Sequence, residues 1–174
     1  MKIRCDLHVN TGARKLILVA GPNEPAGHLA LKLAAYLLFW SEDPILGAGA
    51  KNPALAGFDF LPDLMSLDES GAVKLWVECG STTLHKLLKL TRRLPNARIV
   101  VMKETERDAR RLREDVEEQL DRPGRIEILA WPEGLFADWL ACVGEKTEVY
   151  GEAGGLSLNV VINEQPFVAE LRRF

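Results

Sequence analysis

The stretch PDLMSLDESGAVKLWVECG, residues 62–80, decides the expected fold. Leu64 to Leu67 and Val73 to Glu78 have the apolar, β-branched character of strands. The four residues at 68–71, DESG, are turn formers, and the glycine tolerates a positive φ angle. The stretch predicts an antiparallel hairpin, with Asp63 at the start of its first strand. A turn at 68–71 pairs Asp63 with residues 74–76, within two or three residues of Glu78.

Helices and strands are expected to alternate after this hairpin. Thr82 or Thr83 can cap a helix that ends near Arg93. The next expected elements are a strand, a charged amphipathic helix, a strand and a short helix, over residues 98–103, 105–120, 125–130 and 133–143. Such alternation indicates parallel strand pairing, with helices on the faces of the sheet.

The two ends of the chain are expected to add antiparallel strands. Residues 1–9 and 15–20 predict a second hairpin, and a buried helix follows to about Trp40, with Asn23 as a candidate cap. The tail is expected to hold two strands, at 147–152 and 156–162. We therefore predict an α/β fold, a single domain over residues 1–174 with a mixed central β-sheet flanked by helices.

Composition excludes several classes of protein. The chain has 174 residues, of which 47% are hydrophobic and 27% are charged, which is typical of a globular protein. Its three cysteines are widely spaced, so neither a disulfide framework nor a zinc site is expected. The most apolar stretch, residues 29–40, is too short to cross a membrane. We expect a cytoplasmic protein with no membrane partner, and the net charge of −3 disfavours a protein that coats nucleic acid.

Asp63 and Glu78 are the candidate functional carboxylates. The predicted hairpin brings both toward one end of the same sheet, where their like charges repel unless a cation lies between them. Mg²⁺ accepts one or two carboxylates and can activate water for attack on a phosphate. Alternatively, Asp63 is a turn residue after a proline and Glu78 a solvated acid at a strand end.

The stretch 62–80 resembles the central block of the YaeQ family, which is assigned to the PD-(D/E)XK nuclease superfamily. The resemblance rests on Pro62-Asp63-Leu64, Asp68, Gly71, Leu75-Trp76, Glu78 and Gly80, and NEPAGHLALKLAAYLL at 23–38 is similar to the first helix of the family. It implies a restriction-endonuclease-like fold. Three departures stand out: Gly80 replaces the superfamily lysine, Thr82 replaces a proline, and Gly27 replaces a second acid.

The resemblance also implies a site. Glu24, Asp63 and Glu78 would hold Mg²⁺ or Mn²⁺ for the hydrolysis of a phosphodiester. Lys86 or Lys89 would replace the missing lysine and stabilise negative charge on the phosphate. Because Gly80 is not a lysine, the alternative is a module that has lost hydrolysis and binds nucleic acid or a protein partner. A third reading is a structural adaptor with no cleft.

A group of basic residues shares one face of the helix expected after Thr83. Its members are His85, Lys86, Lys89, Arg92 and Arg93, and no acid lies between Cys79 and Ala97. This face predicts either an ordinary solvated surface or contacts with phosphates of nucleic acid. The helix at 105–120 mixes both signs of charge and is assigned no site. His8 and His28 lack partners at ligand spacing and are expected to be structural.

Overall fold

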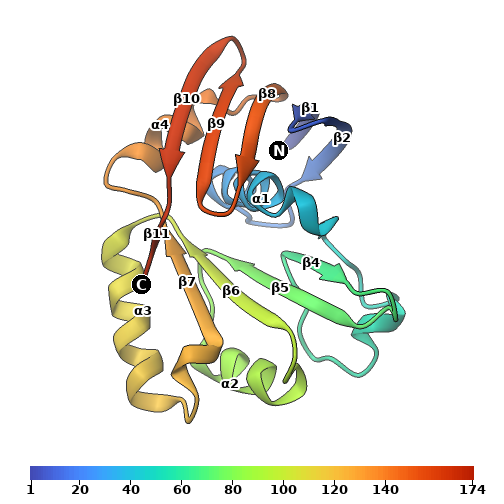
Figure 1. The fold of residues 1–174 in the computed structure, drawn as a ribbon, viewed down its shortest axis with the longest axis vertical. Coiled ribbons are helices and arrows are strands. Elements are labelled where there is room, and N and C mark those ends of the chain that lie inside the picture. Colours follow the sequence, from blue (N-terminus) through green and yellow to red (C-terminus); the bar gives the residue numbers. More distant parts are fainter.

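The computed structural model describes residues 1–174, whose strands form two sheets (Figure 1). Sheet A has the strand order β10-β9-β8-β1-β2, and sheet B has the order β11-β7-β6-β5-β4-β3. The strands are β1 Lys2–Val9, β2 Gly12–Val19, β3 Ile45–Leu46, β4 Leu64–Leu67, β5 Val73–Cys79, β6 Arg98–Lys103, β7 Ile126–Ala130, β8 Lys146–Gly154, β9 Ser157–Ile162, β10 Gln165–Glu170 and β11 Arg172–Arg173. The helices are α1 Ala26–Leu38, α2 Leu84–Arg93, α3 Glu106–Gln119 and α4 Leu135–Cys142.

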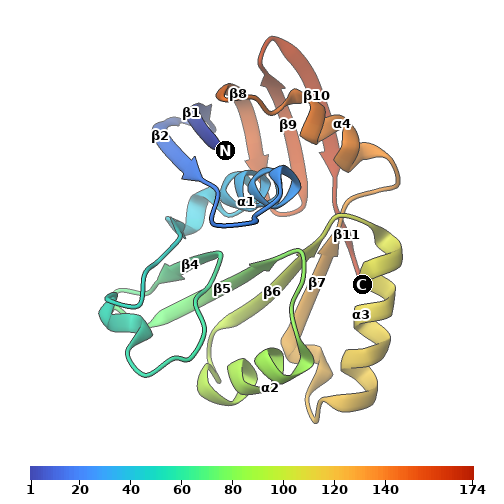
Figure 2. The same ribbon diagram turned by 180° about the vertical axis from the view of Figure 1, so that it is seen from behind.

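Helix α1 lies between the two sheets, as both views of the ribbon show (Figures 1 and 2). From Leu29 to Leu38 every residue of the helix except Lys32 is buried. The inner face of sheet A, one face of sheet B and helix α4 supply the apolar side chains around it, in one cluster of 33 buried residues. One core therefore joins the two sheets.

The opposite face of sheet B is covered by α2 and α3. Its side chains form a second apolar cluster with those helices, in which Trp76 is completely buried. Strands β5, β6 and β7 are parallel to one another, and β4 is antiparallel to β5. Side chains alternate along a strand, so neighbouring residues of β5 face opposite layers: Val77 and Cys79 contact the core around α1, whereas Trp76 faces α2.

The predicted mixed α/β fold with flanking helices is confirmed, but its strands divide between two sheets instead of one. The hairpin of β1 and β2 does not extend the sheet that contains β4 and β5. Instead, β1 pairs in parallel with β8 near the end of the chain. The physical reason is the burial of α1, since a helix that is apolar on nearly all sides needs an apolar surface on both sides.

Three local predictions are corrected. The register of the central hairpin is shifted: Leu64 pairs with Val77, so Asp63 lies beside Glu78, because the strands bulge at Ser66 and Leu67. The tail holds β10 and β11 in addition to the two expected strands. Asn23 does not cap α1; it takes a positive φ of 62° in the preceding turn, and no side chain caps the helix.

None of the four helices has both the length and the apolar character that a membrane span requires.

Gly151 provides a test of the register between β8 and β9. Its φ is +139°, and a Cβ there would lie 2.4 Å from the carbonyl oxygen of Asn159. We predict that Gly151→Ala lowers the free energy of unfolding by about 2 to 3 kcal/mol, because backbone must move to admit the methyl group. Gly154→Ala in the same strand is the control, since a Cβ there meets nothing within 4 Å. Urea denaturation measures both, and equal stability of the two variants would contradict the register.

Candidate functional site: two lysine-neutralised carboxylate groups

Three polar side chains lie at four-residue intervals at the start of α1. Glu24 precedes the helix, and His28 and Lys32 follow it on the same face, because residues four apart are neighbours on a helix. Lys32 is the only charged residue in the buried part of α1, and its side chain is 17% exposed. A lysine in such surroundings needs opposite charges close by.

Asp63 reaches this face of α1 from the start of β4. Its Oδ2 accepts a hydrogen bond from the backbone N–H of Cys79 at 2.8 Å, which fixes the carboxylate at the end of β5. Its Oδ1 lies 3.1 Å from Lys32 Nζ and 3.2 Å from His28 Nε2. The histidine contact departs from ideal hydrogen-bond geometry, whereas the lysine contact is a direct ion pair.

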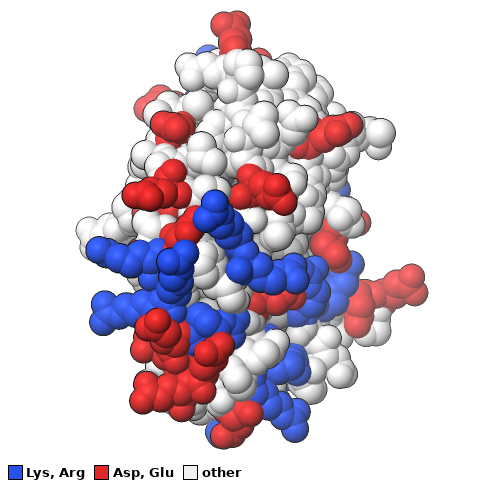
Figure 3. Space-filling view, turned by 60° about the vertical axis from the view of Figure 1, so that its left-hand side comes forward, with Lys and Arg blue, Asp and Glu red and all other residues white.

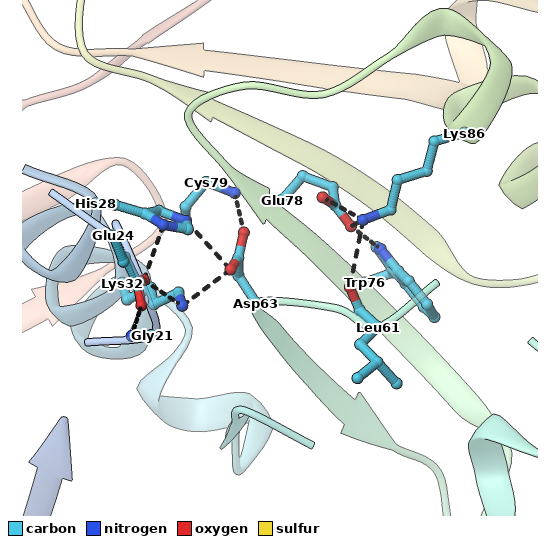
Figure 4. Close-up of polar contacts among 10 residues, drawn as sticks. All are labelled: Gly21, Glu24, His28, Lys32, Leu61, Asp63, Trp76, Glu78, Cys79 and Lys86. Atoms are coloured by element: carbon cyan, nitrogen blue, oxygen red, sulfur yellow. Dashed lines mark hydrogen bonds and ion pairs between the residues drawn. The ribbon is translucent and has the colours of Figure 1, made fainter. Parts of the chain in front are cut away.

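Glu24 completes a group that we name the Lys32 cluster: Glu24, His28, Lys32 and Asp63. Glu24 Oε1 lies 2.7 Å from Lys32 Nζ and 2.8 Å from His28 Nδ1, and Oε2 accepts the backbone N–H of Gly21 at 2.7 Å. Figure 4 shows the two carboxylates directed toward the same ammonium and imidazole groups. Sequence positions 24 and 63 thus meet around a cation that the chain itself provides.

These contacts favour the charged forms of Glu24, Lys32 and Asp63. Burial by itself would raise the pKa of Asp63, but the close imidazole of His28, the hydrogen bond from the backbone N–H of Cys79 and the charge of Lys32 lower it below its ordinary value. The pKa of Glu24 is also lowered, since its bonds to Lys32 and Gly21 outweigh burial. Burial would lower the pKa of Lys32, yet Glu24 and Asp63 raise it. Lys32 is therefore firmly protonated.

Glu78 belongs to a different group, on the α2 side of sheet B. Lys86 Nζ lies 2.7 Å from each of its carboxylate oxygens, and Trp76 Nε1 donates a hydrogen bond at 2.6 Å. Figure 4 shows Glu78 directed toward these two side chains. Only 4% of the Glu78 side chain is exposed, and burial raises its pKa despite the opposing effect of Lys86. We call this the Glu78–Lys86 pair.

The structure therefore brings Glu24 and Asp63 together and turns Glu78 to the opposite face, although Asp63 and Glu78 are neighbours in the backbone. In the whole chain no three His, Cys, Asp or Glu side chains are arranged so that they could hold a metal ion. Glu24 and Asp63 already share an ammonium ion, and Glu78 has its own. As arranged, the three carboxylates do not fit a common Mg²⁺ or Mn²⁺ ion.

A cleft of about 470 Å³ opens beside the Lys32 cluster at the ends of α1 and β5. Glu24, His28 and Lys32 line it together with Gly80, Ser81 and Glu104. The carboxyl ends of parallel strands are a common place for ligand sites in α/β proteins. Gly27 faces Glu104 here, since a Cβ on Gly27 would lie 3.2 Å from Glu104 Oε1.

The predicted basic face of α2 is not a free surface, because residues 57–61 lie along it. Lys86 donates to the carbonyl oxygen of Leu61 as well as to Glu78. Lys89 pairs with Asp59 at 3.1 Å, and Arg93 donates to the carbonyl oxygen of Gly57. His85 meets the ring of Phe60 edge-on, and Arg92 has no ion-pair partner.

The face that carries α3 mixes charges, as expected. Figure 3 shows a band of Lys and Arg across this side of the molecule, with Asp and Glu gathered next to it. Arg110 and Arg172 both pair with Glu106. Glu106 therefore neutralises arginines from both α3 and β11.

Two members of the Lys32 cluster, His28 and Lys32, are not predicted as site residues from the sequence. His28 has no partner at metal-ligand spacing in the sequence, and Lys32 lies within the most apolar stretch of the chain. The usable signal is the four-residue spacing of Glu24, His28 and Lys32, because a lone lysine among apolar residues requires an acid on its own face of the helix or across a layer.

The fold and the cluster define a mixed α/β protein in which carboxylates from different layers are neutralised by lysines of the chain. The family model described as YaeQ protein matches residues 6–150, so the chain belongs to the YaeQ family.

Two solved YaeQ structures resemble the whole chain. The protein from Xanthomonas axonopodis pv. citri is 16% identical, with a TM-score of 0.75 over 99% of this chain and 96% of its own. The protein from Pseudomonas syringae is 15% identical, with a TM-score of 0.73 over 99% and 94%. At these identities the likeness shows the fold alone. No curated protein sequence matches the chain.

The lowered pKa values of Glu24 and Asp63 predict a pH dependence of stability. Each carboxylate binds a proton more readily in the unfolded chain, so the stability it contributes is present at neutral pH. That stability is lost as the pH falls through about 4 and below. Glu78 acts in the opposite sense, because its raised pKa favours the protonated folded form.

We therefore predict that Asp63→Asn lowers the free energy of unfolding by about 2 kcal/mol at pH 7 and flattens its decline toward pH 3. Urea denaturation across this pH range measures both effects. Asp121→Asn, on the exposed surface, should follow the wild-type curve. An Asp63→Asn curve that runs parallel to wild type would show that the Lys32 cluster does not lower the pKa of Asp63.

Proposed function

We propose that the chain is a nucleic-acid-binding protein that does not hydrolyse its ligand. The observation that carries this proposal is the position of Lys32 Nζ, 2.7 Å from Glu24 and 3.1 Å from Asp63. An ammonium ion there neutralises the carboxylates that would otherwise hold a divalent cation. These carboxylates then act as structural partners of α1 and β5.

Two features support the loss of hydrolysis. Glu78, the third expected metal ligand, is buried, and both of its carboxylate oxygens contact the ammonium group of Lys86. Gly80 stands where the PD-(D/E)XK superfamily has a lysine. Of the two candidate replacements, Lys86 is bound to Glu78 and Lys89 is paired with Asp59. Breaking either the Lys32 cluster or the Glu78–Lys86 pair would leave a poorly solvated carboxylate without a partner, which is strongly unfavourable.

Nucleic acid is the expected ligand because of the charge on α2. The helix carries four cations and a histidine and no acid of its own, and of these His85, Arg92 and Arg93 are exposed. Phosphate contacts of this kind hold nucleic acid without requiring a reaction. The net charge of −3 is compatible with such a local surface, since the acidic excess lies elsewhere, in part on α3.

The rival function is Mg²⁺- or Mn²⁺-dependent cleavage of nucleic acid by Glu24, Asp63 and Glu78. It requires Lys32 to leave the two carboxylates and Glu78 to turn away from Lys86. The meeting of Glu24 and Asp63 beside a cleft is the one observation in its favour.

We predict that wild-type protein binds labelled DNA or RNA in EDTA and cleaves neither in Mg²⁺ or Mn²⁺ above the level of Asp63→Ala. Gel assays of binding and cleavage on the same samples measure both. Metal-dependent cleavage that Asp63→Ala abolishes would establish the rival function. Absence of any binding to nucleic acid would leave a protein partner as the ligand to seek.

Lys32 can be tested separately by calorimetric titration with Mn²⁺. Replacing its ammonium group in Lys32→Gln should give tighter Mn²⁺ binding than wild type, because Glu24 and Asp63 lose their shared cation. Equal Mn²⁺ affinity of the two proteins would mean that Lys32 does not block a metal site.

A further inference from the structure

Residues 57–61, GFDFL, form one surface with the exposed side of α2. Phe58 is the fixed point of this segment: its ring stacks on buried Trp76, with centroids 5.5 Å apart, and the guanidinium of Arg93 lies 4.3 Å above it. The segment is held at its other end by Lys86, which binds the carbonyl oxygen of Leu61. Phe60 and Leu61 are thereby presented next to the basic residues of α2.

The outer part of this surface alternates cations with apolar side chains. The Phe60 ring is partly exposed and lies 5.4 Å from Lys89 Nζ, with His85 at its edge. Leu61 is 47% exposed. Arg92, the next cation along the helix, is exposed and has no ion pair. Cations beside exposed rings are the combination that holds phosphates and unpaired bases together.

Asp59 is the only acid in the segment, and its carboxylate forms an ion pair with Lys89. The two charges are 3.1 Å apart, and the Asp59 side chain is 67% exposed. An ion pair so open to solvent is weak. A phosphate oxygen can take the place of this carboxylate on Lys89, because both are oxygen anions that accept from the ammonium group.

We propose that residues 57–61 and the exposed side of α2 bind single-stranded nucleic acid, with Phe60 against a base, Lys89 and Arg92 on phosphates, and Asp59 as a competitor for one phosphate. This inference rests on the proposed function and gives it a surface and a strand preference. Unpaired bases are preferred over a duplex because a stacked, paired base cannot reach Phe60. The surface lies on the α2 side of sheet B, away from the Lys32 cluster.

The test uses the full chain and fluorescence anisotropy with labelled oligonucleotides of about 15 nucleotides, within the span of single-strand sites. DNA and RNA single strands are compared with a duplex of the same sequence at two salt concentrations. Lys89→Gln with Arg92→Gln should weaken single-strand binding about tenfold or more and reduce its salt dependence. Phe60→Ala should weaken single-strand binding about fivefold and leave duplex binding unchanged.

Asp59→Asn is the decisive variant, because it should bind single strands more tightly than wild type. Loss of a folded binding surface lowers binding, so a gain is the opposite of the result expected from misfolding. Arg110→Gln is the matched control: it removes one exposed arginine, on the self-paired face of α3, and should bind like wild type.

The outcomes separate this inference from the proposed function. If wild type binds oligonucleotides but Asp59→Asn and the double variant behave like Arg110→Gln, the surface is wrong and the proposed function stands. Equal binding of duplex and single strand by wild type overturns the strand preference. If wild type binds no oligonucleotide, both proposals fail.

Discussion

The need to bury α1 on nearly its whole circumference is the constraint on which the structure depends. A helix covered on one side only would leave leucines and alanines in water, at about 25 cal/mol for each Å² of apolar surface. Sheet B supplies one wall, and sheet A, with α4, supplies the other. The two sheets are therefore parts of one core, and neither could keep its inner face without the helix.

Lys32 is the exception that this burial has to accommodate. Its ammonium group lies at the boundary between α1 and sheet B, where Glu24 and Asp63 neutralise it. The Glu78–Lys86 pair does the same on the other side of that sheet, between β5 and α2. Neighbouring backbone positions of one hairpin thus direct their carboxylates to two helices. The acids at positions 63 and 78 connect the sheet to the layers on both of its faces.

Much of the fold follows from local sequence, and the rest depends on distant pairings. The helices and most strands could be predicted because their apolar spacing and capping threonines are local. Strand β10 was missed because the turn before it, Asn163-Glu164, has positive φ angles without a glycine to indicate them. The division into two sheets was missed because no local pattern shows that β1 pairs with β8. The family resemblance implies that Glu24 and Asp63 lie together, but no local pattern shows that His28 and Lys32 join them.

The parallel pairing of β1 with β8 has a consequence for how the chain is made. Residues 4–9 of β1 pair with residues 146–151 of β8, so sheet A cannot be completed until most of the chain has been synthesised. Until then β1 and β2 are the only strands of sheet A that can cover α1. A growing chain thus carries an exposed, strongly apolar helix for most of its synthesis, a state prone to aggregation. We therefore expect α1 to become fully buried only after the last strands of sheet A have emerged.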